Sequence, residues 1–170
     1  DAPHAFAAAD VEEAAARLAR LLRAERATVL TIYDDHGGYG HPDHIQVHRV
    51  GLRAAEIAGT PHVFESTMNR DYIKMLMTER APELSDTVDP PPVEDFDDFG
   101  SPESIITTTV DVRDFVEQKR AAMAAHASQI PKDSFFLSLP PEAFREAFGY
   151  EWFIRRGAPT GTRESTIFLD

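Results

Sequence analysis

The spacing of apolar residues predicts helices alternating with strands along this chain. Apolar positions recur at helical intervals between Asp10, which can cap a helix, and Arg26. A short β-branched run over 27–33 is typical of a buried strand. A second helix is expected over 42–58, because a proline opens this segment and Gly59 follows it.

The second half of the chain continues the alternation with shorter elements. The expected strands lie over 61–65, 105–112 and 150–154, and the expected helices over 69–79, 114–128 and 140–148. Strands joined through helices imply right-handed crossovers and parallel pairing. The pattern therefore predicts a single α/β domain over residues 1–170, with a mostly parallel sheet.

One segment, at about 82–103, departs from this pattern. It holds five prolines and eight acidic residues, and no lysine or arginine. Such composition favours a long irregular loop. A solvated surface excursion is the first interpretation of this acidic, proline-rich loop, and a lid over a site is the alternative.

Charge and cysteine content narrow the function classes. The chain has 17 basic and 29 acidic residues, a net charge of −12, which argues against nucleic acid or an anionic membrane as a partner. It has no cysteine, which fits a reducing cytoplasm and leaves only His, Asp, Glu or water as metal ligands. We find no signal peptide and no apolar run of transmembrane length.

The densest chemistry lies in the stretch 33–44, directly after the first predicted strand. Glycines allow this stretch to bend tightly, and strand, loop and helix start is where open α/β sheets bind ligands. A metal site and an acid/base site are both consistent with its side chains. Its titratable members are three imidazoles and three carboxylates: His36, His41, His44, Asp34, Asp35 and Asp43.

His41 and His44 are three residues apart and flank Asp43 at the start of a helix. A catalytic zinc has typically three protein ligands and one open position for water. The metal lowers the pKa of that water to about 7. Asp43 is placed to hydrogen-bond an imidazole and select its tautomer.

The same stretch carries a family resemblance. The run Gly-Gly-Tyr-Gly-His-Pro-Asp-His over 37–44 resembles the second signature of the LmbE-like (PIG-L) zinc-dependent N-acetylglucosamine deacetylases. Within that family, the sequence of this motif is most similar to the actinobacterial, mycothiol-pathway branch, which includes mycothiol conjugate amidases. Agreement continues through 63–71 and 119–129 and ends near 148–151. The resemblance implies a Rossmann-like, three-layer α/β/α fold.

The resemblance also implies roles for four residues. His44 would be a ligand of Zn²⁺, or of another divalent metal. His41 would stabilise the oxyanion and protonate the leaving amine, Asp43 would orient or tune a histidine, and Tyr39 would lie at the mouth of the site. The implied activity is hydrolysis of an N-acyl, typically N-acetyl, amide on a small-molecule amino-sugar conjugate.

The chain departs from the family pattern at its N-terminus. The family's other two zinc ligands and its general base lie in an Ala-His-Pro-Asp-Asp-Glu-like motif, and the sequence after His4 does not match it. We therefore expect a C-terminal portion of the family domain that lacks the N-terminal βα portion and has an exposed apolar sheet edge. Further ligands would come from Asp34, Asp35, a second subunit or polypeptide beyond this sequence. The alternative function is that of a truncated, inactive member acting as a folded fragment or binding module, which associates with itself or with a partner.

Three other histidines are interpreted structurally. His36 is expected to be solvated, and His126 to lie at a helix end. His48 lies one helical turn after His44. We interpret it as a helix-surface residue, with an outer contact to the site as the alternative.

Overall fold

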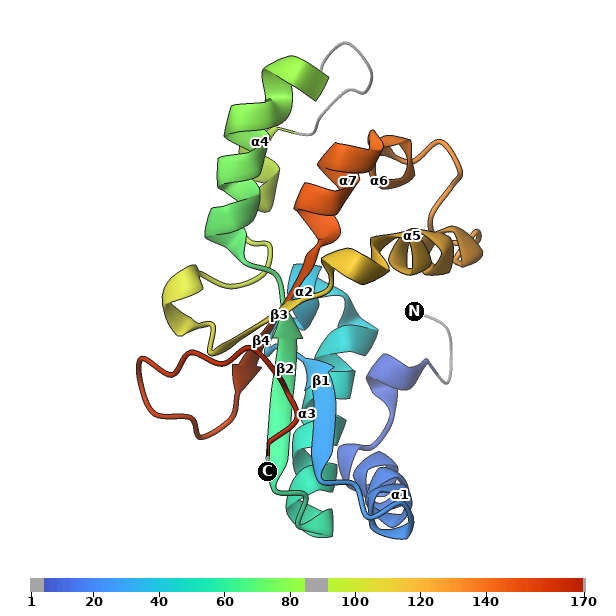
Figure 1. The fold of residues 1–170 in the computed structure, drawn as a ribbon. Coiled ribbons are helices and arrows are strands. Elements are labelled where there is room, and N and C mark those ends of the chain that lie inside the picture. The colour runs from blue at the N-terminus through green and yellow to red at the C-terminus, as the bar shows by residue number, and fades with distance from the viewer. Residues whose placement is uncertain (1–4, 85–91, 170) are drawn as a thin grey trace.

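A four-stranded mixed sheet forms the centre of the molecule (Figure 1). The structure is a computed structural model that describes residues 5–84 and 92–169, with the backbone alone over 80–84. The strand order is β1-β2-β4-β3. The strands are β1 (Val29–Tyr33), β2 (His62–Thr67), β3 (Thr108–Asp111) and β4 (Tyr150–Arg155).

The sheet confirms the predicted α/β class, but one of its strands runs in the opposite direction to the other three. Strands β1 and β2 pair in parallel, whereas β4 is antiparallel to both β2 and β3. Three strands therefore share one direction, and β4 runs against them. Within the described residues β1 pairs on one side only and forms an edge of the sheet, as expected from the sequence.

Two long helices cover the β1 side of the sheet. Helix α1 (Val11–Ala24) packs on α3 (Pro42–Ala58), and α3 packs on β1. Asp10 accepts a hydrogen bond from the Glu13 amide at 2.8 Å and so caps α1. Gly59 ends α3 with a left-handed φ of 74°. The buried residues between the helices are Ala15, Ala19, Leu22, Val50 and Ala54.

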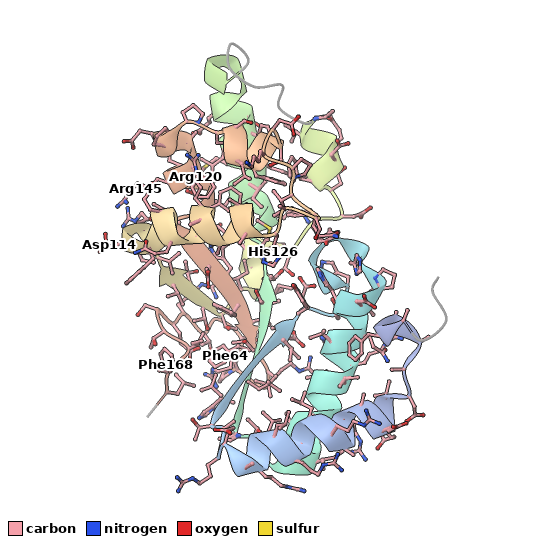
Figure 2. All side chains as sticks on the ribbon, turned by 90° about the vertical axis from the view of Figure 1, so that its right-hand side faces the viewer. Phe64, Asp114, Arg120, His126, Arg145 and Phe168 are labelled. Atoms are coloured by element: carbon pink, nitrogen blue, oxygen red, sulfur yellow. The ribbon has the colours of Figure 1, made fainter. Side chains whose placement is uncertain are left out.

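The remaining helices gather beyond the carboxyl end of β2 (Figure 1). This arrangement differs from the expected second helical layer on the other face of the sheet. Helices α5 and α7 pack together, and the Arg120 guanidinium on α5 lies 4.3 Å from the ring centre of Phe144 on α7 (Figure 2). The four helices are α4 (Arg70–Leu84), α5 (Val116–Ala125), α6 (Phe135–Ser138) and α7 (Pro141–Phe148).

The acidic segment at 82–103 is more structured than its composition indicates. Helix α4 extends to Leu84, and short 3₁₀ turns follow at η2 (Val93–Phe96) and η3 (Glu103–Ile105). Phe96 is buried against Ile73 and Met77 of α4. The described part is therefore anchored to the fold by apolar side chains, while its acidic residues Glu94, Asp95, Asp97, Asp98 and Glu103 are exposed. Residues 85–91 of the predicted loop lie outside the described residues.

Short turns complete the described chain. They are η1 (Phe6–Ala8), α2 (Gly37–Gly40) and η4 (Arg113–Phe115), of which only α2 lies in the predicted site stretch. In the described ranges no helix is both long and apolar enough to cross a bilayer.

Candidate active site

The site stretch leaves the carboxyl end of β1 and turns sharply into α3. Gly37, Gly38 and Gly40 have φ values of 69°, 73° and 85°, which other residues rarely adopt. A Cβ on Gly37 would lie 2.9 Å from the Cβ of His44. The glycines thus let the chain fold back on α3 and bring the predicted residues together.

The buried carboxylate of Asp34 is hydrogen-bonded to this turn. The residue is only 1% exposed, and its carboxylate accepts hydrogen bonds from the Gly38 amide at 2.6 Å and the Thr67 hydroxyl at 2.6 Å. Thr67 lies at the end of β2 and also bonds the Ser101 hydroxyl at 3.0 Å. A buried carboxylate needs such donors, since an unpaired charge is costly to desolvate. Asp34 therefore fits a scaffold role better than that of a metal ligand.

His44, in the first turn of α3, has its ring plane fixed from two sides. The Tyr33 ring stacks on it, with centroids 3.9 Å apart and planes 4° from parallel. Nδ1 of His44 donates to the Gly37 carbonyl oxygen at 3.2 Å. Because Nδ1 carries the proton, Nε2 of the neutral ring has a free lone pair. Donation of one ring nitrogen to a backbone carbonyl is the usual arrangement for a metal-binding imidazole.

His41 has the opposite arrangement. It caps α3, and its Nδ1 accepts the Asp43 amide hydrogen at 3.2 Å. In the neutral ring the proton therefore lies on Nε2, which is free to donate. The rings of His41 and His44 are 4.8 Å apart. The site thus presents one imidazole as a donor and its neighbour as an acceptor.

Tyr39 is exposed beside His41 and His44, and its predicted place at the mouth of a site stays a prediction. It is 59% exposed, and its ring meets that of His44 edge-on at 5.2 Å. The Tyr39 ring also stacks on Phe99 at 6.3 Å. Segment 96–101 therefore contacts the Tyr39 ring through Phe99.

Asp43 orients His41 through its backbone amide. Its carboxylate accepts a hydrogen bond from the Ala7 amide at 2.8 Å, which ties η1 to the start of α3. The expected contact between this carboxylate and a histidine ring is absent from the hydrogen bonds of the described residues. The tuning role of Asp43 stays a prediction.

Segment 99–101, which we call the strap, fastens the site turn to the end of β2. The Gly100 amide donates to the Gly38 carbonyl at 2.9 Å, and the Ser101 amide to the Met68 carbonyl at 2.8 Å. Arg70 donates to the carbonyls of Phe99 and Gly100, at 3.0 and 2.7 Å. A Cβ on Gly100 would come within 2.2 Å of the Met68 carbonyl oxygen, so this approach requires glycine.

His48 and Glu65 form a second titratable group, on the α3 side of the sheet. The side chain of His48 is only 12% exposed, which corrects its interpretation as a helix-surface residue. Its Nδ1 donates to the Tyr33 carbonyl at 3.0 Å and lies 3.6 Å from Oε1 of Glu65. Burial raises the pKa of the Glu65 carboxyl, although the Arg156 guanidinium at 3.4 Å opposes the shift.

His36 is also less solvated than expected. Its side chain is 36% exposed, and its Nδ1 lies 2.8 Å from Oδ1 of Asp35. That hydrogen bond is the main reason why the pKa of Asp35 is below its usual value. His126 ends α5, as expected, and is exposed (Figure 2).

A pocket of about 280 Å³ opens beside the carboxyl end of β2. We call it the polar pocket because an ion pair lies on its otherwise mostly apolar wall. Lys119 and Glu151 form an ion pair on its wall at 3.2 Å, and Trp152 and Tyr150 supply aromatic surface. Ser66, which pairs with Tyr33 in the sheet, also lines it. The polar pocket therefore begins one strand away from the tyrosine that stacks on His44.

The described residues do not by themselves fit a complete zinc site. Among them, no three His, Asp or Glu side chains converge on one point. His44 presents a free ring nitrogen, Asp34 is occupied by hydrogen bonds, and His4 lies outside the described residues. One protein ligand is fewer than the typical three of a catalytic zinc.

The sequence did not predict the residues that pack against or hydrogen-bond to the site stretch from elsewhere in the chain. Thr67, Ser101 and Phe99 reach it from positions about 30 or more residues further along the chain. No local pattern reports such a contact. For Tyr33, its place as the last residue before the predicted loop was a usable signal, because it had to lie near the start of that loop.

Comparison with curated proteins finds relatives along nearly the whole chain. A protein from Catenulispora acidiphila is 38% identical over 95% of this chain, and one from Acidothermus cellulolyticus is 38% identical over 98%. A third, from Nocardiopsis dassonvillei, is 40% identical over 98%. All three are named 1D-myo-inositol 2-acetamido-2-deoxy-alpha-D-glucopyranoside deacetylase, the first with the number 1. The predicted resemblance is therefore confirmed.

The match is partial on the side of the relatives. The chain covers 55%, 59% and 64% of these three proteins, in the same order. No protein-family model matches the chain.

Proposed function

Because this chain is a relative of the LmbE-like deacetylases of actinobacteria, we propose that its parent protein hydrolyses the N-acetyl amide of an amino-sugar conjugate. The observation that carries this proposal is the pair of opposed imidazoles. His41 offers a ring N–H and His44 a ring lone pair, with 4.8 Å between the rings. Deacetylation and cleavage of a mycothiol-type conjugate amide remain alternative forms of this reaction.

Amide hydrolysis needs two things that His41 can supply. Negative charge develops on the carbonyl oxygen, and the departing nitrogen must receive a proton. The neutral ring, with its N–H on Nε2, can donate a hydrogen bond to that oxygen. To act as the general acid the ring first takes up a second proton on Nδ1, the atom that accepts the Asp43 amide hydrogen. The proton on Nε2 then passes to the amine and leaves a neutral ring. Tyr39, exposed beside both histidines, is placed to contact the same tetrahedral centre.

Among the described residues, His44 is the one zinc ligand that we propose. A zinc ion would polarise the amide and supply hydroxide near neutral pH. The lone pair on Nε2 of His44 would be one ligand, held in direction by Gly37 and Tyr33. We propose that the other ligands come from polypeptide beyond the described residues. A different divalent metal would satisfy the same ligand.

The polar pocket is the proposed sugar site. Its ion pair and the Ser66 hydroxyl offer hydrogen bonds to hydroxyl groups, and its aromatic walls suit the apolar faces of a sugar ring. A sugar bound there would lie one strand away from Tyr33, whose sheet partner Ser66 lines the pocket. The relatives' names specify a glucosamine joined to inositol. We propose a small-molecule conjugate of that class.

The test compares three proteins made with the additional length that the relatives have. His44→Ala is expected to lose both zinc and acetate release. His41→Ala is expected to keep its zinc and to lose about 10²–10⁴-fold in kcat, the usual contribution of a general acid. Zinc is measured by elemental analysis and acetate by a coupled assay.

His62→Gln is the matched control, since His62 begins β2 at the other end of the strand from the site. It should retain zinc and turnover. Equal acetate release by wild type and His44→Ala would refute the assignment.

A second candidate function is favoured by the incomplete ligand set and the edge position of β1. The 170-residue chain alone would then be an inactive folded module that pairs through β1 with another copy or with a partner. It should bind less than one zinc per chain and release no acetate. Sedimentation analysis would detect self-association. Stoichiometric zinc with turnover would contradict this candidate. The cytoplasmic location stays a prediction.

A further inference from the structure

An apolar cavity of about 150 Å³ lies among the helices beyond the sheet. Helix α4 contributes Ile73 and Met77, and α5 contributes Met123. Phe96 comes from η2, and Phe99 is the first residue of the strap. Among the described residues, every side chain that lines it is aliphatic, aromatic or a methionine. This composition sets it apart from the polar pocket.

A cavity of this kind is poor at holding water. A buried water needs about three polar partners, and here the lining side chains offer none. A fully enclosed apolar cavity of about 150 Å³ can bind benzene. The cavity described here is partly open to solvent, which gives such a molecule a way in. The atoms that line an empty cavity also lack contacts on one side, so an apolar occupant restores dispersion attraction.

The cavity adjoins the site on two sides. Met68, Met123, Ala147 and Phe148 line both the cavity and the polar pocket. Phe99 lines the cavity and stacks on Tyr39 at 6.3 Å. A molecule in the cavity therefore lies one side chain away from both the polar pocket and Tyr39.

We propose that this cavity is a binding site for an apolar group of about the size of a benzene ring, either free or carried by a larger ligand. The proposal concerns binding alone and does not rest on the proposed hydrolysis. The volume sets the size of the occupant, and the wholly apolar lining sets its chemistry.

The four methionines provide a direct test. Met68, Met77 and Met123 line the cavity, whereas Met75 does not and is 43% exposed. The 170-residue chain is labelled with ¹³C at the methionine methyl groups and titrated with benzene. Saturable shifts are expected for the three lining methyl groups, with Met75 unchanged. Unchanged signals at all four, or shifts as large at Met75 as at the others, would overturn the proposal.

A pair of substitutions locates the binding. Ala147→Leu places a larger side chain in the cavity wall and is expected to weaken benzene binding at least tenfold. Ala122→Leu on the exposed side of α5 is the matched control and should leave the affinity within twofold. Circular dichroism confirms that each variant is folded. Undiminished binding by folded Ala147→Leu would contradict the site, and the wild-type titration decides the question if that variant does not fold.

Discussion

At the scale of single residues, the candidate site depends on polar groups that never face a substrate. Asp34 is buried and receives its donors from the site turn and from β2. The direction of the His44 ring depends on a carbonyl and on the Tyr33 ring. Catalytic geometry is set by such supports, since an imidazole free to rotate would present either nitrogen.

Thr67→Val tests the support of Asp34. The substitution keeps the shape of the side chain but removes the hydroxyl that donates to Oδ2 of Asp34 at 2.6 Å. We expect a loss of about 1–3 kcal/mol in the free energy of unfolding, because a buried carboxylate loses a donor. Urea denaturation measures it. Thr31→Val, exposed on β1, should change stability by less than about 0.5 kcal/mol.

Glu65 predicts a pH dependence of stability. Its folded pKa is raised above 4.5 by burial, so the folded state binds the proton more tightly than the unfolded state does. Its contribution to stability is present below pH 4.5 and is lost as the pH rises through the raised pKa. Wild type should therefore lose stability over this pH window, whereas Glu65→Gln should not. The melting temperature of wild type should fall relative to that of the variant by about 2–4 °C for each kcal/mol of stability that wild type loses.

Glu164 provides the control of opposite sign. The hydrogen bond from Arg155 lowers the pKa of Glu164, so its contribution is present above pH 4.5 and is lost as the pH falls through the lowered value. Glu164→Gln should be less stable than wild type at neutral pH, and the deficit should vanish in acid. A pH-independent difference for both variants would contradict the assignment of these shifts.

At the scale of elements, close packing of α3 on β1 decides where the site lies. Gly51 sits in the middle of α3 against Ile32, and a Cβ there would come within 2.4 Å of the Cγ2 methyl of Ile32. The helix can therefore approach the strand closely. That approach places the first turn of α3, with His41 and His44, over the end of β1.

Gly51→Ala tests this contact. Alanine favours helix by about 1 kcal/mol in an open position. Here overpacking against Ile32 should cost about 1–3 kcal/mol and outweigh that gain. Denaturation of the single and double variants measures the balance. In an Ile32→Ala background the cost should shrink or change sign, and an unchanged cost would mean that the contact is unimportant.

The sequence predicts elements well where the signals are local. Helix α3 begins at Pro42 and ends before Gly59, as expected, because a first-turn proline and a left-handed glycine act within a few residues. The direction of β4 was not predicted, since it pairs with β2 across more than 80 residues. The turn at 37–44 was predicted because its signal is local. Ser101, which bonds Thr67 behind the turn, was missed because it lies far from both in the sequence.

At the scale of the whole molecule, the helices form two groups, one along the β1 side of the sheet and one beyond the carboxyl end of β2 (Figure 1). Helices α1 and α3 build one group around Val50 and Ala54, and α4 to α7 build the other around Phe144 and Phe96. The site turn lies at the boundary and touches the second group through Tyr39 and Phe99. The histidines therefore come from one group, and the polar pocket and the cavity largely from the other.

Because the strap is hydrogen-bonded both to the site turn and to the segment after β2, we expect these three segments to open together. The Gly38 amide is held by Asp34, the Gly100 amide by Gly38, and the Ser101 amide by Met68. In a deuterium-exchange experiment these three amides should become labelled at one common rate, slower than that of exposed turns. A Gly100→Ala substitution should raise all three rates together. Opening of the turn that carries Tyr39 then requires release of the strap, a segment that lies some 60 residues away in the chain.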